Sequence, residues 1–246
     1  MEEINQPQQL TKKERRKLKK QRKLEAHQKQ ARQQKIKKLG WWSAIVLGIV
    51  TVVFAFRLSG RSASDQPTLA VDAVAVSDQT KGNSESKVLL VEYSDFQCPA
   101  CGRYYPLLKQ LNQEFGDRIQ FVYRHFPLKQ THRNAEPAAF AAEAAGKQGK
   151  FWEMHDLIFE GQENWSEKRN AKDTFIEYAK SLDLDMEKFQ TDVKSKEIKN
   201  KVRNDYSSGI KAGVNSTPTL FLNGKKLQNP RGYEELKKLI EGALDQ

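Results

Sequence analysis

The sequence predicts a mixed α/β domain over the C-terminal two thirds of the chain. Short apolar runs typical of buried strands alternate with longer segments of helical periodicity. The first run, Val88–Val91, leads directly to two cysteines and then to a helical pattern of apolar residues. Ahead of this domain, a strongly basic segment precedes an uncharged apolar segment. The chain is therefore expected to combine one α/β domain with a membrane-targeting N-terminus.

The N-terminal segment differs from the rest of the chain in charge. Residues 1–40 hold 14 Lys or Arg and 4 Asp or Glu, whereas residues 62–246 hold 26 and 27. The domain is thus nearly neutral, and we expect no nucleic-acid partner for the protein as a whole. We expect residues 1–38 to be a basic cytoplasmic tail that orients the chain and contacts the lipid bilayer; contact of the tail with RNA is the alternative.

Residues 39–57 predict a transmembrane signal-anchor. The 18 uncharged residues Leu39–Phe56 extend about 27 Å as a helix, close to the thickness of the hydrocarbon core. Positive charge ahead of this span keeps the N-terminus cytoplasmic. We therefore expect a single-pass protein of the cell membrane whose catalytic domain is extracytoplasmic, in an oxidising compartment. A cleaved signal peptide is the alternative.

The elements after the span follow from turn residues and periodicity. Residues 58–82 are polar and predict a linker, in which the apolar patch Leu69–Val76 is expected to add a short strand. Residues 83–246 are expected to form the domain. Its expected elements are a strand at 88–93, a helix from Cys98, a strand at 119–125, a helical insertion at about 131–212 with helices at Ala171–Leu182 and Met186–Lys211, a strand at 219–222 with a hairpin at Asn223-Gly224, and a closing helix through Tyr233, Leu236, Ile240 and Leu244.

The chain has two cysteines, Cys98 and Cys101, one helical turn apart. The free amides and the dipole at a helix N-terminus stabilise a thiolate, so the pKa of Cys98 is expected below that of a free thiol. Thiol–disulfide exchange requires a thiolate that forms a mixed disulfide and a second thiol that resolves it. We therefore predict that Cys98 is the nucleophile and Cys101 the resolving thiol.

Two other interpretations of this pair are a zinc half-site and a static structural disulfide. A structural zinc site needs four ligands, and the four histidines of the chain form no close pair at zinc-finger spacing. A disulfide across two residues removes little chain entropy from the unfolded state. Neither interpretation explains why the pair opens a helix directly after a strand.

Five short segments carry a resemblance to a known family. In chain order they are Gly82-Asn83, Val91–Cys101, Tyr123–Leu128, Gln148–His155 and Ser216–Thr219. With them, residues from about Gly82 to Ala243 resemble the DsbA-like family of extracytoplasmic thiol–disulfide oxidoreductases. The resemblance implies a thioredoxin-like fold with an inserted helical subdomain. It also implies that the redox centre is a Cys98–Cys101 disulfide. The sequence has no glycine-rich phosphate loop and no close cluster of metal ligands, so we expect no separate cofactor or metal.

The resemblance implies roles for three more residues. Pro218 falls where the family holds a cis-proline opposite the disulfide, and Thr217 would offer backbone groups to an extended substrate. Glu92 would tune the thiols and move protons for Cys101. A trans Pro218 that starts an edge strand and a solvent-facing Glu92 are the alternatives. His125, in the next strand, is expected to be a structural histidine.

One departure from the family concerns Ala100, which stands where the best-known member has a histidine that stabilises the thiolate. The chain is therefore expected to be a milder oxidant. The resemblance implies a membrane-anchored oxidase that introduces disulfides into reduced exported proteins and is reoxidised by a membrane quinone-linked partner. A tethered reductase or isomerase reverses the electron flow, and a non-enzymatic chaperone or binding module is a third alternative.

Overall fold

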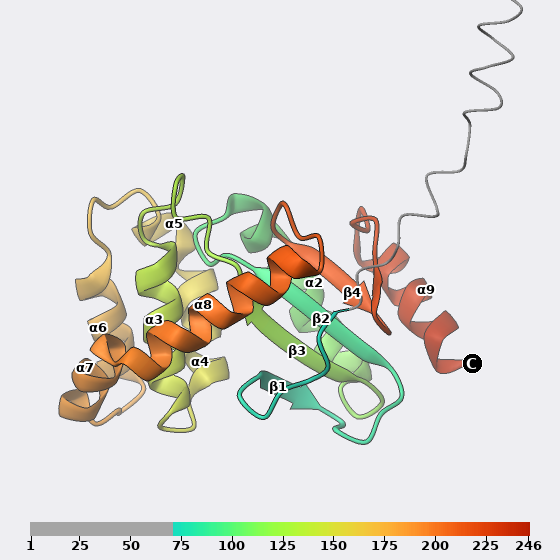
Figure 1. Cartoon of the computed structure of the whole chain (residues 1–246), viewed down its shortest axis with the longest axis horizontal. Helices are drawn as coiled ribbons and strands as arrows, with labels where there is room; N and C mark the ends of the chain where they lie inside the picture. The colour runs from blue at the N-terminus through green and yellow to red at the C-terminus, as the bar shows by residue number, and fades with distance from the viewer. Residues whose placement is uncertain (1–70) are drawn as a thin grey trace, which may run out of the picture. The chain divides into compact units, whose positions relative to one another are not determined.

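The computed structural model describes residues 71–246 (Figure 1). The predicted cytoplasmic tail at 1–38, the predicted span at 39–57 and the first part of the predicted linker lie outside these residues. Across residues 71–246, no helix combines the length and the apolar character needed to cross a membrane.

A five-stranded sheet forms the centre of the domain, in the order β1-β3-β2-β4-β5. β2 pairs in parallel with β3 and antiparallel with β4, which makes β2 the central strand. β1 and β5 pair antiparallel with β3 and β4. The strands are β1 (Gln79–Gly82), β2 (Leu89–Ser94), β3 (Gln120–His125), β4 (Thr219–Leu222) and β5 (Lys225–Lys226).

Helices cover both faces of this sheet (Figure 1). α2 (Pro99–Phe115) supplies the crossover that the parallel pair β2–β3 requires, and α9 (Tyr233–Leu244) closes the chain. The remaining helices form the insertion between β3 and β4. They are α3 (Ala135–Gly146), α4 (Phe151–Glu160), α5 (Gln162–Trp165), α6 (Lys172–Ser181), α7 (Met186–Lys194) and α8 (Lys196–Lys211).

Successive side chains of β2 point to opposite faces of the sheet, so the core has two layers. Leu90 joins the larger cluster, with Leu108 and Leu111 of α2. Val91 and Tyr93 join a smaller cluster on the face that α8 crosses. Gly209 of α8 lies so close to this face that a Cβ atom would stand 2.7 Å from the ring of Phe126. The glycine therefore permits the close approach of α8 to the sheet.

Two predicted elements are wrong. The apolar patch Leu69–Val76 forms no strand in its described part, residues 71–76; the first strand is β1, at Gln79–Gly82. β1 is an edge strand that depends on backbone pairing with β3 rather than on apolar side chains. The helix expected at Met186–Lys211 is two helices, because Ser195 adopts an extended conformation and caps α8. Its side chain accepts a hydrogen bond from the backbone amide of Ile198, in the first turn of α8.

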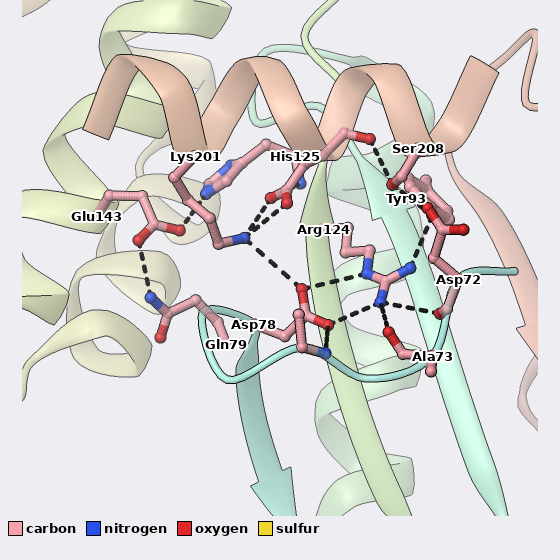
Figure 2. Close-up of polar contacts among 12 residues, drawn as sticks. Asp72, Ala73, Asp78, Gln79, Tyr93, Arg124, His125, Glu143, Lys201 and Ser208 are labelled. Carbon is pink, nitrogen blue, oxygen red and sulfur yellow. Dashed lines mark hydrogen bonds and ion pairs between the residues drawn. The ribbon is translucent and has the colours of Figure 1, made fainter. Parts of the chain in front are cut away.

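A buried ion cluster fastens the segment before β1 to the sheet (Figure 2). Arg124 Nη2 donates to Asp78 Oδ2 at 2.7 Å, and both side chains are only 3% exposed. The same guanidinium donates to the hydroxyl of Tyr93. It also donates to the carbonyls of Asp72 and Ala73. Lys201 of α8 approaches Asp78 at 3.8 Å, so the cluster joins three parts of the chain.

Candidate active site

The two cysteines lie at the start of α2, directly after the central strand. Cys98 is the N-cap residue, with an extended conformation, and Pro99 takes the first helical position. Proline suits that position because its fixed φ matches the helix, and because an amide hydrogen there would have no partner within the helix. The prediction that the helix opens at the cysteines is therefore confirmed.

Both cysteines are free thiols, in different surroundings. Cys98 is 8% exposed and Cys101 is completely buried. The thiol of Cys98 donates to the backbone carbonyl of Thr217 at 3.5 Å, and the peptide bond between Thr217 and Pro218 is cis. The loop before β4 thus lies against the Cys98 sulfur, as the family resemblance implies, and the trans alternative for Pro218 is excluded.

The two thiols have opposite pKa shifts. A hydrogen bond from Cys101 is the largest influence that lowers the pKa of Cys98 to about 5; burial opposes it, and Thr217 and the first helical amides add to it. Burial raises the pKa of Cys101 well above its ordinary value, and the neighbouring Cys98 and the charge of Glu92 raise it further. At neutral pH, Cys98 is therefore a thiolate and Cys101 a thiol, which is the asymmetry that exchange requires.

Glu92 lies on the α2 side of β2 and is 2% exposed, so the solvent-facing alternative is excluded. Burial raises its pKa to about 7, while the Ser94 hydroxyl and the positive charge of Lys81 act in the opposite direction. A carboxyl group with this pKa exchanges its proton readily at neutral pH. Its charge also influences Cys101, so the structure brings the two groups into one electrostatic unit.

Two polar residues beside this unit are not predicted by the sequence. Lys81 and His155 line a cavity of about 10 Å³ together with Glu92. Lys81 belongs to the polar edge strand, which carries no recognisable pattern. His155 ends one of the segments on which the family resemblance rests, yet a histidine in an aromatic helix looks structural in sequence.

A second missed pair orders the loop in front of Cys98. Asp95 accepts a hydrogen from the backbone amide of Gln97 and another from that of Leu128. Its Oδ2 also lies 2.8 Å from His132 Nδ1. This hydrogen bond raises the pKa of His132, and the nearby Cys98 thiolate contributes in the same direction. When His132 is protonated, it places positive charge near the Cys98 thiolate.

His125, at the end of β3, lies in a polar cluster with residues of α3 and α8 (Figure 2). His125, Glu143 and Asp205 bring their ligand atoms within 4.8 Å of one another, a spacing that a metal ion could bridge. Protein groups already engage these atoms: His125 Nε2 bonds Glu143 at 2.9 Å, and Lys201 bonds both oxygens of Asp205. The cluster is a satisfied structural network, as expected for His125.

A family model described as Thioredoxin matches residues 75–242. A Na(+)/H(+) antiporter NhaA 3 from Salinispora tropica is 36% identical over 167 residues, which make up 68% of this chain and 25% of that protein. The chain thus spans about a quarter of the length of the curated relatives it matches.

Solved structures agree with the family match. Wolbachia pipientis alpha-DsbA1 matches with a TM-score of 0.62 at 20% identity, over 70% of this chain and 93% of that one. A thioredoxin-like oxidoreductase from Silicibacter pomeroyi DSS-3 matches with a TM-score of 0.58 at 25% identity, over 69% and 93%. The chain therefore belongs to the thioredoxin family, and its inserted helices give it the DsbA-like form of that fold.

Proposed function

We propose that the chain is a thiol–disulfide oxidoreductase that acts as an oxidase of exported proteins. One observation carries the proposal: a Cys98 thiol of low pKa faces the Thr217–Pro218 loop, while Cys101 is buried with a raised pKa. A thiolate that is stable in the reduced protein makes the disulfide a better electron acceptor. The family match and the structural likenesses to oxidoreductases support the same activity.

The reaction transfers two electrons from a substrate dithiol to the Cys98–Cys101 disulfide. A substrate thiolate attacks Cys98 Sγ, the Cys98–Cys101 bond breaks, and the sulfur of Cys101 leaves and takes up a proton, with Glu92 as its donor. A second substrate thiolate then attacks the substrate sulfur of the mixed disulfide and releases Cys98 as a thiolate. In the reverse direction Cys101 attacks Cys98 and resolves the mixed disulfide.

The substrate segment is proposed to bind in an extended conformation along Thr217, with Pro218 shaping the loop. The proposed setting is the outer side of the cell membrane, with residues 39–57 as the anchor and residues 1–38 in the cytoplasm. A membrane quinone-linked partner would accept the two electrons and restore the disulfide. The uncharged span and the basic segment before it support this arrangement.

Trapping tests the proposal. A Cys101→Ser variant of the full chain should accumulate mixed disulfides with reduced exported proteins, because Cys98 keeps its thiolate and nothing resolves the complex. A Cys98→Ser variant should form none and lose oxidase activity; retained activity would refute the assignment. Equilibration with glutathione then gives the reduction potential, which indicates the direction of electron flow. A potential near that of thioredoxin, about −270 mV, would indicate a reductase or isomerase instead.

A further inference from the structure

The cavity beside Glu92 gathers buried polar atoms that lack partners. Within residues 71–246, six buried side-chain atoms make no hydrogen bond. His155 Nε2 and Asn112 Oδ1 belong to residues that line the cavity. The hydroxyl of Tyr123 is a third atom without a partner; burial raises the pKa of Tyr123, and the nearby charge of Glu92 raises it further. Such clustering indicates a polar site rather than packing defects. The volume of about 10 Å³ is close to that of a single water position.

His155 connects this cavity to a carboxylate at the surface. Its side chain is almost fully buried in α4, and its Nδ1 lies 2.9 Å from Asp156 Oδ1. Because a carboxylate accepts, Nδ1 carries the hydrogen and Nε2 keeps its lone pair. Asp156 is 30% exposed and lies 3.2 Å from Lys109, which also reaches solvent. One imidazole thus stands between the buried cavity and the surface.

We propose that His155 and Asp156 form the route by which protons pass between Glu92 and solvent during disulfide exchange. This inference rests on the proposed function, in which Glu92 supplies a proton to Cys101. When Cys101 leaves as a thiolate, it takes the proton of the Glu92 carboxyl group. In the reverse reaction Glu92 takes the proton of Cys101 and passes it through a water in the cavity to the lone pair of His155 Nε2, while the hydrogen on His155 Nδ1 moves to Asp156. The carboxylate regains a proton by the same steps in reverse. His155 is therefore a positioning and relay residue, and the reaction of the sulfurs is unchanged.

The electrostatics suit a relay that is neutral at rest. Burial lowers the pKa of His155 to about 4, while Asp156 acts to raise it and the charges of Lys81 and His125 lower it. The resting imidazole therefore stays neutral and is protonated only briefly, while a proton passes along the route. A permanently charged residue at this place would instead hold the proton and block the route. Lys81 also lines the cavity, and it offers a competing route that the test must exclude.

The test compares rates with equilibria. In the purified full chain, His155→Gln keeps a donor toward Asp156 but cannot relay a proton. We expect dithiothreitol to reduce the Cys98–Cys101 disulfide about tenfold more slowly at pH 7, and the reverse reaction to slow equally. The equilibrium constant with glutathione should stay within about twofold of the wild type, because a relay changes rates in both directions alike. Asp156→Asn should slow the reaction in the same way.

Two controls separate a relay from a loss of structure. His125→Gln alters another buried histidine that is bonded to a carboxylate, and it should leave the rate and its pH profile intact. Equal slowing in His125→Gln, or wild-type rates in His155→Gln, would overturn the proposal, as would a defect found in Lys81→Met instead. Failure of the wild-type chain to oxidise exported proteins, with normal dithiothreitol kinetics, would refute the oxidase assignment but leave this test of the relay valid.

Discussion

Acidification should reveal the Cys98 thiolate as a change of slope in the reduction potential. With the pKa of Cys98 at about 5 and that of Cys101 far higher, reduction above pH 5 takes up one proton for two electrons. Below pH 5 it takes up two. Since each proton contributes about 30 mV per pH unit, the slope should change from about −30 to about −60 mV per unit as the pH falls through 5.

The lowered pKa of Cys98 also determines how far the reduction potential is raised at neutral pH. Two pH units separate the pKa of Cys98 from pH 7, so the thiolate raises the potential by about 59 mV, or about 2.7 kcal/mol, over a pair with ordinary thiols. Thioredoxin has a thiol pKa of about 7 and a potential of about −270 mV; DsbA has about 3.5 and −120 mV. Correcting each of these two potentials for the difference in thiol pKa gives this chain an expected reduction potential between about −220 and −165 mV.

The assay is equilibration of the full chain with glutathione buffers at half-unit steps across this pH range, with thiols trapped by alkylation and counted by mass. Ultraviolet absorbance of the thiolate gives the pKa of Cys98 independently, and Cys98→Ser supplies the baseline. A single slope of about −60 mV per unit up to pH 8 would show that Cys98 is an ordinary thiol. The reasoning from hydrogen bonding at the helix N-terminus would then fail.

Three other substitutions test single features. Glu92→Gln removes a carboxyl group whose pKa burial raises to about 7. The free-energy cost of burying its charge is absent below pH 4.5 and complete above pH 7. Urea unfolding should therefore show the variant more stable than the wild type by up to about 3 kcal/mol at pH 8 and equally stable at pH 4. Thr217→Val removes a hydroxyl that lowers the pKa of Cys98; that pKa should rise by about one unit and the potential should fall by about 30 mV. Asp78→Asn leaves Arg124 buried without its ion partner and should cost about 3–5 kcal/mol in urea unfolding at pH 7.

Matched variants define the outcomes that contradict these predictions. A stability difference for Glu92→Gln that does not vary with pH would show that the carboxyl is not titrating in the core. Thr217→Ser keeps the hydroxyl and should keep the wild-type potential; a fall equal to that of Thr217→Val would exclude the hydroxyl as the cause. Lys180→Met breaks an exposed pair with Glu177 and should cost less than about 1 kcal/mol. A similar small cost for Asp78→Asn would mean that the buried cluster contributes little.

The parts of the fold that follow from local patterns were predictable. The apolar run of β2, the cysteines at the start of α2 and the Asn223-Gly224 hairpin after β4 each carry their own sequence signature. The strand β1 has no such signature, since it depends on pairing with β3 across some forty residues of chain. The break between α7 and α8 is marked only by Ser195, whose role as an N-cap competes with the helix propensity of the residues around it.

The candidate site divides in the same way. Cys98, Cys101 and Glu92 belong to one continuous segment, so spacing along the chain places them correctly. Lys81 and His155 reach the site only through the pairing of β1 with β3 and the packing of α4 against α2. Their positions depend on tertiary contacts that no local window of the sequence contains.

The separation of Cys98 and Thr217 along the chain ties chemical reactivity to completed folding. The two residues lie 119 positions apart, and the pairing of β2 with β4 that joins them encloses the whole helical insertion. Contacts of such separation form late, because the entropy of closing a long loop must first be offset. Until then Cys98 lacks its contact with the Thr217–Pro218 loop. A nascent or damaged copy of the chain therefore lacks the contribution that Thr217 makes to the low pKa of Cys98.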